Sequence, residues 1–291
     1  MALFERHAAT VGRDPVLVVA LEGWIDAGFA AATSMAALLE TIPTRRYASF
    51  VPDELIDYRA RRPRLRIEDG LRGKIEFVSP QLLVGSDPLG AGVAFLVGPE
   101  PDFRWQAFAN DVASLATEIG TRLVVGLGAF PVAAPHTRAV RLVATASDPE
   151  LARKVGFVPG VIEAPAGAAE VVAAACTEAG IPSIGLWAQV PHYVSGMAFV
   201  PGALALVEGL AALTGLVIDT DDLRESADAS RKRVDELIAQ SEEHAALVRR
   251  LEEQWGEDHA GGAFGETMLG EPLPSGEELA AELERYLRGD L

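Results

Sequence analysis

The segment Pro15-Val16-Leu17-Val18-Val19-Ala20-Leu21 decides the fold class of this chain, together with Gly23-Trp24-Ile25-Asp26-Ala27-Gly28, which follows it after one residue. The first segment is a continuous run of β-branched and apolar residues, which is typical of a strand buried on both faces. Small residues between positions 27 and 40 then predict a helix that packs closely on a sheet. A buried strand that leads into a helix is the repeating unit of α/β folds with parallel strands.

The same alternation continues along the chain. Further strands are predicted at residues 46–51, 94–98, 122–129, 141–145 and 184–190, and helices at 103–119, 167–178 and 200–213, with another helix starting at Asp148. This rhythm predicts an α/β fold with three α/β/α layers and a mainly parallel sheet that is covered on both faces. Asp69-Gly70 interrupts the rhythm and predicts a hairpin between residues 65–68 and 74–78, with a loop longer than two residues.

Composition and charge exclude several classes of protein. Of the 291 residues 49% are hydrophobic, which is typical of a globular chain and not of a disordered one. The net charge of −17 would be repelled by a phosphate backbone, so we expect no nucleic-acid partner. The longest apolar run, at 200–218, contains Glu208 and Pro201 and predicts a buried helix, not a membrane span. Cys176 is the single cysteine, and we expect a buried, inert thiol in a cytoplasmic protein.

The acidity is concentrated at the end of the chain. After residue 218 there are 20 acidic and 8 basic residues, a net charge of −12 against −5 for the preceding part. This boundary predicts an α/β core domain at 1–218 and an acidic helical extension at 219–291, which is either a solvated surface or an arm that meets a partner. Apolar spacing predicts one long helix or a helical hairpin at 220–255, resting on its own domain or on a neighbouring subunit. A glycine-rich loop and a capping box of Ser275 and Glu278 then lead into a last helix.

Polar and aromatic side chains gather where four of the predicted strands end. They are Trp24 and Asp26, then Glu100, Asp102 and Trp105, then His136 and Arg138, and finally His192. If these strands are parallel, the eight residues share one edge of the sheet, where open α/β sheets bind ligands. His136, His192 and Glu100 are the candidate catalytic groups, because a His beside a carboxylate can act as a general base. Arg138 could hold an anion.

Each of these residues also has a structural explanation. The three carboxylates are suited to cap the helices that follow them. His136 could bond a backbone carbonyl, Arg138 could pair with one of the acids, and the two tryptophans could be core or interface aromatics. The sequence contains no dinucleotide or phosphate loop, no zinc-protease motif and no esterase elbow. We therefore expect no metal and no cofactor.

Four motifs together resemble the proteasome assembly chaperone two family, in its actinobacterial form. They are Gly23-Trp24-x-Asp26-Ala27-Gly28, Asp53-Glu54-Leu55-Ile56-Asp57-Tyr58-Arg59-x-Arg61-x-Pro63, Gly98-x-Glu100-Pro101-x-x-x-Trp105 and Pro135-His136-Thr137-Arg138. The resemblance runs from about residue 16 to residue 218. The tail segment between Leu273 and Arg288 also looks like that subgroup.

The resemblance implies a phosphorylase/hydrolase-like α/β/α core, a homo-oligomer with a trimer as the expected assembly, and no established catalytic activity. Family members in eukaryotes and archaea bind proteasome α-subunits, some through a C-terminal hydrophobic-Tyr-x signature that Arg288-Gly289-Asp290-Leu291 lacks. Two functions stay open. One is a non-enzymatic oligomer that binds proteins, proteasome subunits among them. The other is a protein that uses the edge of the sheet to bind or transform an anionic or nucleoside-like small molecule.

Overall fold

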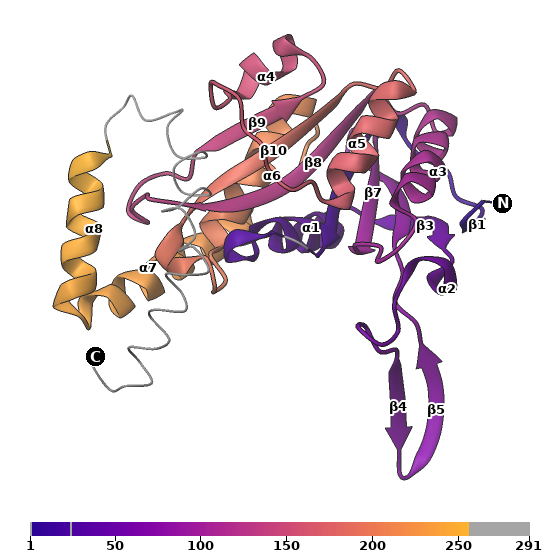
Figure 1. Cartoon of the computed structure of the whole chain (residues 1–291), viewed down its shortest axis with the longest axis horizontal. Helices are drawn as coiled ribbons and strands as arrows, with labels where there is room; N and C mark the ends of the chain where they lie inside the picture. Colours follow the sequence, from indigo (N-terminus) through magenta and orange to yellow (C-terminus); the bar gives the residue numbers. More distant parts are fainter. Residues whose placement is uncertain (1, 24, 256–291) are drawn as a thin grey trace, which may run out of the picture.

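The computed structural model describes residues 2–23 and 25–255, which are built around one eight-stranded sheet (Figure 1). Across this sheet the strands follow the order β1-β3-β6-β7-β2-β8-β10-β9. Their bounds are Phe4–Arg6 (β1), Arg13–Glu22 (β2), Thr44–Phe50 (β3), Gln81–Ser86 (β6), Ala91–Pro99 (β7), Leu123–Val132 (β8), Leu142–Ala146 (β9) and Ser183–Pro191 (β10).

The four central strands run parallel, since β7 pairs with β2, β2 with β8, and β8 with β10. β2 shows why the sheet has two covered faces. Val16 and Val18 belong to one buried apolar cluster, and Leu17 and Val19 belong to another. Because alternate side chains of a strand point to opposite faces, each face of the sheet carries its own core.

Helices cover both faces. Their bounds are Ala30–Thr41 (α1), Pro52–Leu55 (α2), Trp105–Glu118 (α3), Pro149–Val155 (α4), Ala168–Glu178 (α5) and Val200–Thr214 (α6), with short 3-10 turns at Ala27–Phe29 (η1) and His192–Val194 (η2). α1 packs beside α6 on one face, and α3 packs beside α5 on the other. Cys176 is buried in α5, as expected, and burial raises the pKa of its thiol to about 12.

The sheet is mixed, so the expectation of a mainly parallel sheet is corrected. Three of its seven neighbouring pairs are parallel, and four are antiparallel: β1 with β3, β3 with β6, β6 with β7, and β9 with β10. A tight turn around Asp87 joins β6 to β7, and such a short connection permits only an antiparallel pair. The predicted strands did not include β1 or β6. The phosphorylase/hydrolase-like character of the core stays an expectation.

β4 (Arg64–Glu68) and β5 (Leu71–Glu76) form a separate two-stranded ribbon that projects from the body of the molecule (Figure 1). Every residue of both strands is exposed. Asp69 and Gly70 have φ values of 50° and 79°, which is the backbone of a two-residue hairpin turn. The hairpin is therefore confirmed, but the expectation of a longer loop is wrong, because β5 begins at Leu71.

The chain after α6 forms two helices, α7 (Asp221–Ala239) and α8 (Glu242–Gln254), so the alternative of one long helix is wrong. The two helices meet at an angle and do not lie side by side as in a helical hairpin (Figure 1). α7 packs against α6, and its Val234 belongs to the same apolar cluster as the sheet residues of that face. α7 thus rests on the core of its own chain. Among the described residues, no helix combines the length and the apolar character needed to cross a bilayer.

The remaining predictions for the C-terminal part lie outside the described residues. They are the glycine-rich loop at 256–270, the capping box of Ser275 and Glu278, the last helix, and the tail segment between Leu273 and Arg288.

Candidate functional site

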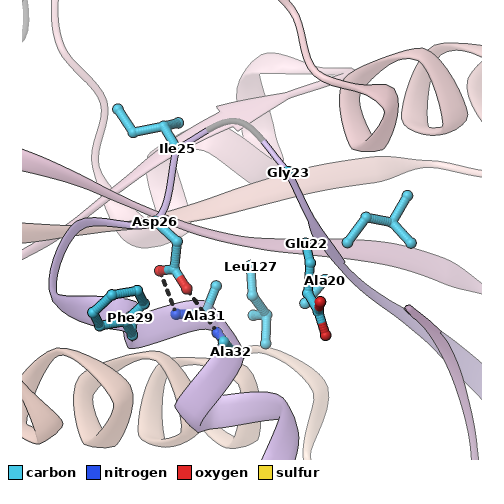
Figure 2. Close-up of a pocket in the computed structure, with 10 residues that line it drawn as sticks. Ala20, Glu22, Gly23, Ile25, Asp26, Phe29, Ala31, Ala32 and Leu127 are labelled. Atoms are coloured by element: carbon cyan, nitrogen blue, oxygen red, sulfur yellow. Dashed lines mark hydrogen bonds between the residues drawn. The ribbon is translucent and has the colours of Figure 1, made fainter. Parts of the chain in front are cut away.

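Asp26 lies beyond the carboxyl end of β2 and holds the start of α1 (Figure 2). Its two carboxylate oxygens accept hydrogen bonds from the backbone N–H groups of Ala31, at 2.8 Å, and Ala32, at 2.9 Å. Asp26 therefore binds N–H groups of the first turn of α1, as the capping alternative predicted, but α1 begins at Ala30 after the η1 turn and not at Ala27. Burial raises the pKa of Asp26, and the backbone hydrogen bonds only partly oppose that rise. Trp24, two residues earlier, lies outside the described residues.

The glycines of the same motif are explained by close packing. Gly28 has a φ of +66°, and a Cβ there would lie 2.9 Å from the Cβ of Phe199. Its N–H donates to the carbonyl of Ser195 at 2.8 Å, which ties this turn to the turn after β10. A Cβ at Gly23 would lie 2.5 Å from Oε2 of Glu100. The motif therefore brings the ends of β2, β7 and β10 together.

A cavity of about 500 Å³ lies beside Asp26, at the carboxyl edge of β2 (Figure 2). Its described lining residues include two carboxylates, Glu22 and Asp26, and no cation. Ile25, Phe29 and Leu127 supply apolar surface. Two carboxylates repel an anion, so this cavity suits an uncharged or cationic molecule better than the anionic ligand that the sequence suggested.

Glu100 lies beyond the carboxyl end of β7 and caps a helix. Its Oε1 accepts a hydrogen bond from the backbone N–H of Ala168, the first residue of α5. Its own backbone N–H donates to the carbonyl of Glu22 at 2.7 Å, and its carbonyl accepts from Arg61. Capping was predicted for the helix that follows Glu100 in the chain. The helix that it caps is α5, far along the sequence, and not α3.

Asp102 fixes the loop before the hairpin. Its Oδ2 accepts from the backbone N–H of Asp57 at 2.7 Å, and its Oδ1 lies 3.5 Å from the guanidinium of Arg61. The predicted capping of α3 by Asp102 is wrong, because α3 begins after Arg104, whose φ is +60°, and no side chain caps it. Trp105 is half-buried at the first position of α3, and its indole N–H donates to a backbone carbonyl four residues earlier.

Among the described candidate residues, His136 is the one that is buried, with an exposed fraction of 2%. Its Nδ1 lies 2.7 Å from the hydroxyl of Tyr193, and that hydroxyl also accepts the backbone N–H of His136 at 2.7 Å. Its Nε2 lies 3.0 Å from Oδ1 of Asp235 in α7. A neutral imidazole protonated at Nε2 satisfies all three contacts, with the Tyr193 hydroxyl donating to Nδ1. Burial raises the pKa of Tyr193 to about 12, which keeps this donor protonated.

His192 and Arg138 lie nearby but are exposed. Nδ1 of His192 lies 3.2 Å from the carbonyl of Val132, and its ring meets Tyr193 edge-on at 5.4 Å. Among the described residues, the guanidinium of Arg138 has no hydrogen bond and no ion pair. The predicted alternative, that Arg138 pairs with one of the three acids Asp26, Glu100 and Asp102, is therefore not found among these residues.

The parallel central strands place all the described candidates at one edge of the sheet, but their contacts fall into separate sets. His136 and His192 share Tyr193, Glu100 and Asp102 share Arg61, and Asp26 binds α1 alone. Sequence reasoning missed two of these partners, Asp235 and Arg61. Arg61 falls in a quoted family motif, which is a signal that could have found it. Asp235 lies in a predicted helix, and nothing in the pattern of that helix indicates that its side chain reaches the carboxyl ends of the strands.

The PAC2 family model matches residues 20–238, which is three quarters of the chain. The chain belongs to the PAC2 family. The resemblance stated from the four motifs is thereby confirmed. No curated protein matches the chain.

Solved structures of actinobacterial proteins agree with this assignment. A PAC2 family protein from Streptomyces avermitilis is 36% identical with a TM-score of 0.71, and the match covers 81% of this chain and 100% of that one. A Mycobacterium tuberculosis protein of unknown function is 33% identical with a TM-score of 0.79, covering 86% and 90%. A proteasome-assembly chaperone homologue from Mycobacterium tuberculosis is 31% identical with a TM-score of 0.74, covering 80% and 99%.

Proposed function

We propose that this PAC2 protein is a non-enzymatic, cytoplasmic protein that associates with copies of itself and binds other proteins, with proteasome subunits as the first partners to test. The projecting hairpin carries the proposal. Four of its large apolar side chains are between 42% and 74% exposed, namely those of Leu65, Ile67, Leu71 and Ile75, and Phe77 directly after β5 is 48% exposed. Apolar surface concentrated on a projecting element is typical of a protein-interaction site. A two-stranded ribbon alone is marginally stable in water, so a bound partner would also stabilise it.

The contacts of the polar residues support a role without catalysis. A general base must reach a proton of the substrate, but both ring nitrogens of His136 are bonded to neighbouring side chains. Asp26 and Glu100 are occupied by the backbone N–H groups of α1 and α5. The relative described as a proteasome-assembly chaperone homologue supports the choice of partner. In this proposal residues 1–218 are the core domain and residues 219–291 are an extension.

Binding of purified proteasome subunits from the same source organism tests the proposal. We expect the full chain to retain α-subunits on a native gel and in gel filtration, and we expect Ile67→Asp with Ile75→Asp to lose that binding. Val161→Asp is the control, because Val161 is apolar, 95% exposed and not part of the hairpin. Absence of binding by the wild-type chain would contradict the choice of partner. Equal binding by the hairpin variant would contradict the role of the hairpin.

The cavity beside Asp26 favours a second candidate function, the binding of a small nucleoside-like molecule. A volume of about 500 Å³ falls in the usual range for ligand sites, and the carboxyl edge of parallel strands is their usual place. A ligand at 100 times its dissociation constant adds about 2.7 kcal/mol of stability. A thermal-shift screen with nucleosides should therefore raise the Tm of the wild-type chain, and Phe29→Ala should weaken the shift. No shift with any nucleoside would remove this candidate.

A further inference from the structure

A second cavity, of about 270 Å³, lies over β9 and β10, on the face of the sheet where α5 packs. Leu186 and Ala188 of β10 belong to the apolar cluster under α1 and α6, so Trp187 between them points to the opposite face. This cavity is here called the tryptophan slot. Its lining residues include Trp187, Thr145, Glu170, Val158, Ile162 and Pro165.

Two glycines let the indole ring of Trp187 lie along the surface of the sheet. Gly128 is the register partner of Trp187 on β8, and a Cβ there would lie 2.5 Å from the ring. A Cβ at Gly185, on the same face of β10, would lie 3.0 Å from the indole nitrogen. The indole N–H donates to Oγ1 of Thr145 at 3.2 Å, and the ring meets Phe130 edge-on at 6.5 Å. The ring is therefore a fixed apolar floor for the slot.

The segment between α4 and α5, residues 156–167, forms the other wall of the slot and contains no helix or strand. Its Val158, Ile162 and Pro165 line the slot, and Val158 belongs to the same apolar cluster as Trp187. Long irregular segments of this kind commonly act as binding loops. An indole floor and an apolar wall together suit a flat ring between them.

Glu170 is the one charged residue among the described residues that line the slot. Its Oε2 accepts the backbone N–H of Gly167 at 3.0 Å. Burial raises the pKa of Glu170, the nearby charge of Glu100 raises it further, and backbone hydrogen bonds only partly oppose the rise. The carboxylate thus lies in negative and partly desolvated surroundings with no basic side chain in the described lining. A bound cation would offset both effects.

We propose that the tryptophan slot binds a flat aromatic amine, with its ring on the indole of Trp187 and its ammonium group at the carboxylate of Glu170. Ring stacking and a charge-assisted hydrogen bond would each contribute to the affinity. The volume of about 270 Å³ lies just below the usual range of roughly 300–1,000 Å³ for ligand sites, so one ring system with a short amine arm fits best.

This site is distinct from the cavity beside Asp26, although Ile25 lines both. The carboxylates differ, since Glu22 and Asp26 line the first cavity and Glu170 lines the slot. The inference therefore goes beyond the proposed function and depends on neither of its candidates.

Isothermal titration calorimetry with three indole probes tests the site. Tryptamine carries an ammonium group, tryptophol an uncharged hydroxyl and indole-3-propionate a carboxylate, while all three share the ring. We expect tryptamine to bind at least about tenfold more tightly than the other two, because only its arm forms a charge-assisted hydrogen bond with Glu170. Glu170→Gln should weaken tryptamine binding at least about tenfold and change tryptophol binding by less than about twofold.

Glu178→Gln is the matched control, because it removes the same charge from an exposed residue of α5, about two turns after Glu170, that does not line the slot. It should change the three affinities by less than about twofold. Ile162→Ser tests the apolar wall without changing a charge, at a side chain that is 39% exposed. It should weaken binding of tryptamine at least about fivefold.

Far-UV circular dichroism checks that each variant is folded before it is titrated. The inference is overturned if the wild-type chain does not bind tryptamine, or if the three probes bind equally. It is also overturned if Glu178→Gln weakens tryptamine binding as much as Glu170→Gln does, or if Ile162→Ser leaves tryptamine binding unchanged.

Discussion

Tyr193 joins two loops at the carboxyl edge of the sheet through one hydroxyl group. That hydroxyl accepts the backbone N–H of His136 and contacts its Nδ1, each at 2.7 Å. Because His136 is buried, loss of the hydroxyl leaves polar groups without a partner. We predict that Tyr193→Phe lowers the free energy of unfolding by about 1–3 kcal/mol, as measured by urea denaturation.

The Asp235→Asn variant is the comparison for Tyr193→Phe. Asp235 is the other partner of the His136 ring, but its side chain is 60% exposed. Water can replace an exposed carboxylate, so Asp235→Asn should cost about 1 kcal/mol or less. Equal losses for the two variants would contradict the view that the buried hydroxyl is the more important partner.

Asp87 fixes the turn between β6 and β7 and also the segment before α7. It accepts hydrogen bonds from the backbone N–H groups of Leu89, Ala91 and Val217, at 2.9, 2.8 and 2.9 Å. Burial alone would raise the pKa of Asp87, but the backbone hydrogen bonds together outweigh it and hold the pKa below its ordinary value. Its ionised form is therefore the one that stabilises the fold.

The lowered pKa of Asp87 makes stability depend on pH. A carboxylate with a depressed folded pKa stabilises the folded state above its unfolded pKa of about 3.9, and this contribution is lost as the pH falls through the folded pKa. We predict that Asp87→Asn costs about 1.5–3 kcal/mol at neutral pH. Its deficit against the wild-type chain should narrow below about pH 4. Urea denaturation from neutral to acidic pH measures the deficit, and a constant deficit would contradict the prediction.

At the scale of single residues, two capping residues were predicted correctly from local signals, the predicted capping of α3 by Asp102 was wrong, and partners distant in the sequence were missed. Asp26 caps α1, and Asp148 accepts from the N–H groups of the first turn of α4, as their positions before helix patterns predict. Glu100 caps α5 and His136 bonds Asp235, which are contacts between segments far apart in the sequence. No local pattern encodes such pairs, because the fold brings them together.

The β4–β5 ribbon adds surface without adding to the core. No residue of either strand is buried, and Phe77 at its end packs on Tyr58, with ring centroids 5.0 Å apart. We predict that replacing residues 64–76 by a short glycine-serine linker changes the free energy of unfolding by less than about 1 kcal/mol, because none of the residues of β4 and β5 belongs to the buried core. Thermal and urea denaturation of a dilute sample measure the change. A large loss of stability would show that the ribbon supports the core.

At the scale of elements, periodicity found strands that are buried on both faces and missed the others. β2, β7, β8 and β10 are continuous apolar runs, and each was predicted. β6 alternates between buried and partly buried residues and contains a glycine, and β1 has only three residues. The start of β5 was misplaced because Arg72 and Gly73 do not follow a strand pattern. Asp69-Gly70 still located the hairpin itself.

At the scale of the whole molecule, the class of the fold follows from the sequence but the order of the strands does not. Strands alternating with helices indicate an α/β sheet covered on both faces. The antiparallel edges arise from the tight turn before β7 and from the pairing of β9 with β10, and pairing depends on the whole chain. The charge of the C-terminal part is a second example, because the sequence gives its amount and not its place in the fold. The net charge of −12 after residue 218 was evident from the sequence, but the structure was needed to place the acidic start of α7 near Asp87, which accepts the N–H of Val217.

Net charge leads to a prediction about the complete assembly. Attraction between opposite charges at a contact between two copies is local, and salt screens it over about 8–10 Å at physiological ionic strength. The apolar part of the contact is not screened in this way. We predict that self-association weakens between about 0.05 and 0.3 M salt but does not vanish. Sedimentation velocity across that range measures it, and association that strengthens steadily with salt would point to a contact without charge complementarity.

The mass of the protein in solution, with and without the hairpin, tests the central claim most directly. Sedimentation equilibrium compares the wild-type chain of 30.8 kDa with the chain in which a linker replaces residues 64–76. The account predicts a multiple of the single-chain mass for the wild type and a single-chain mass for the shortened protein. A monomeric wild-type chain, or a shortened chain that keeps the full assembly, would contradict it.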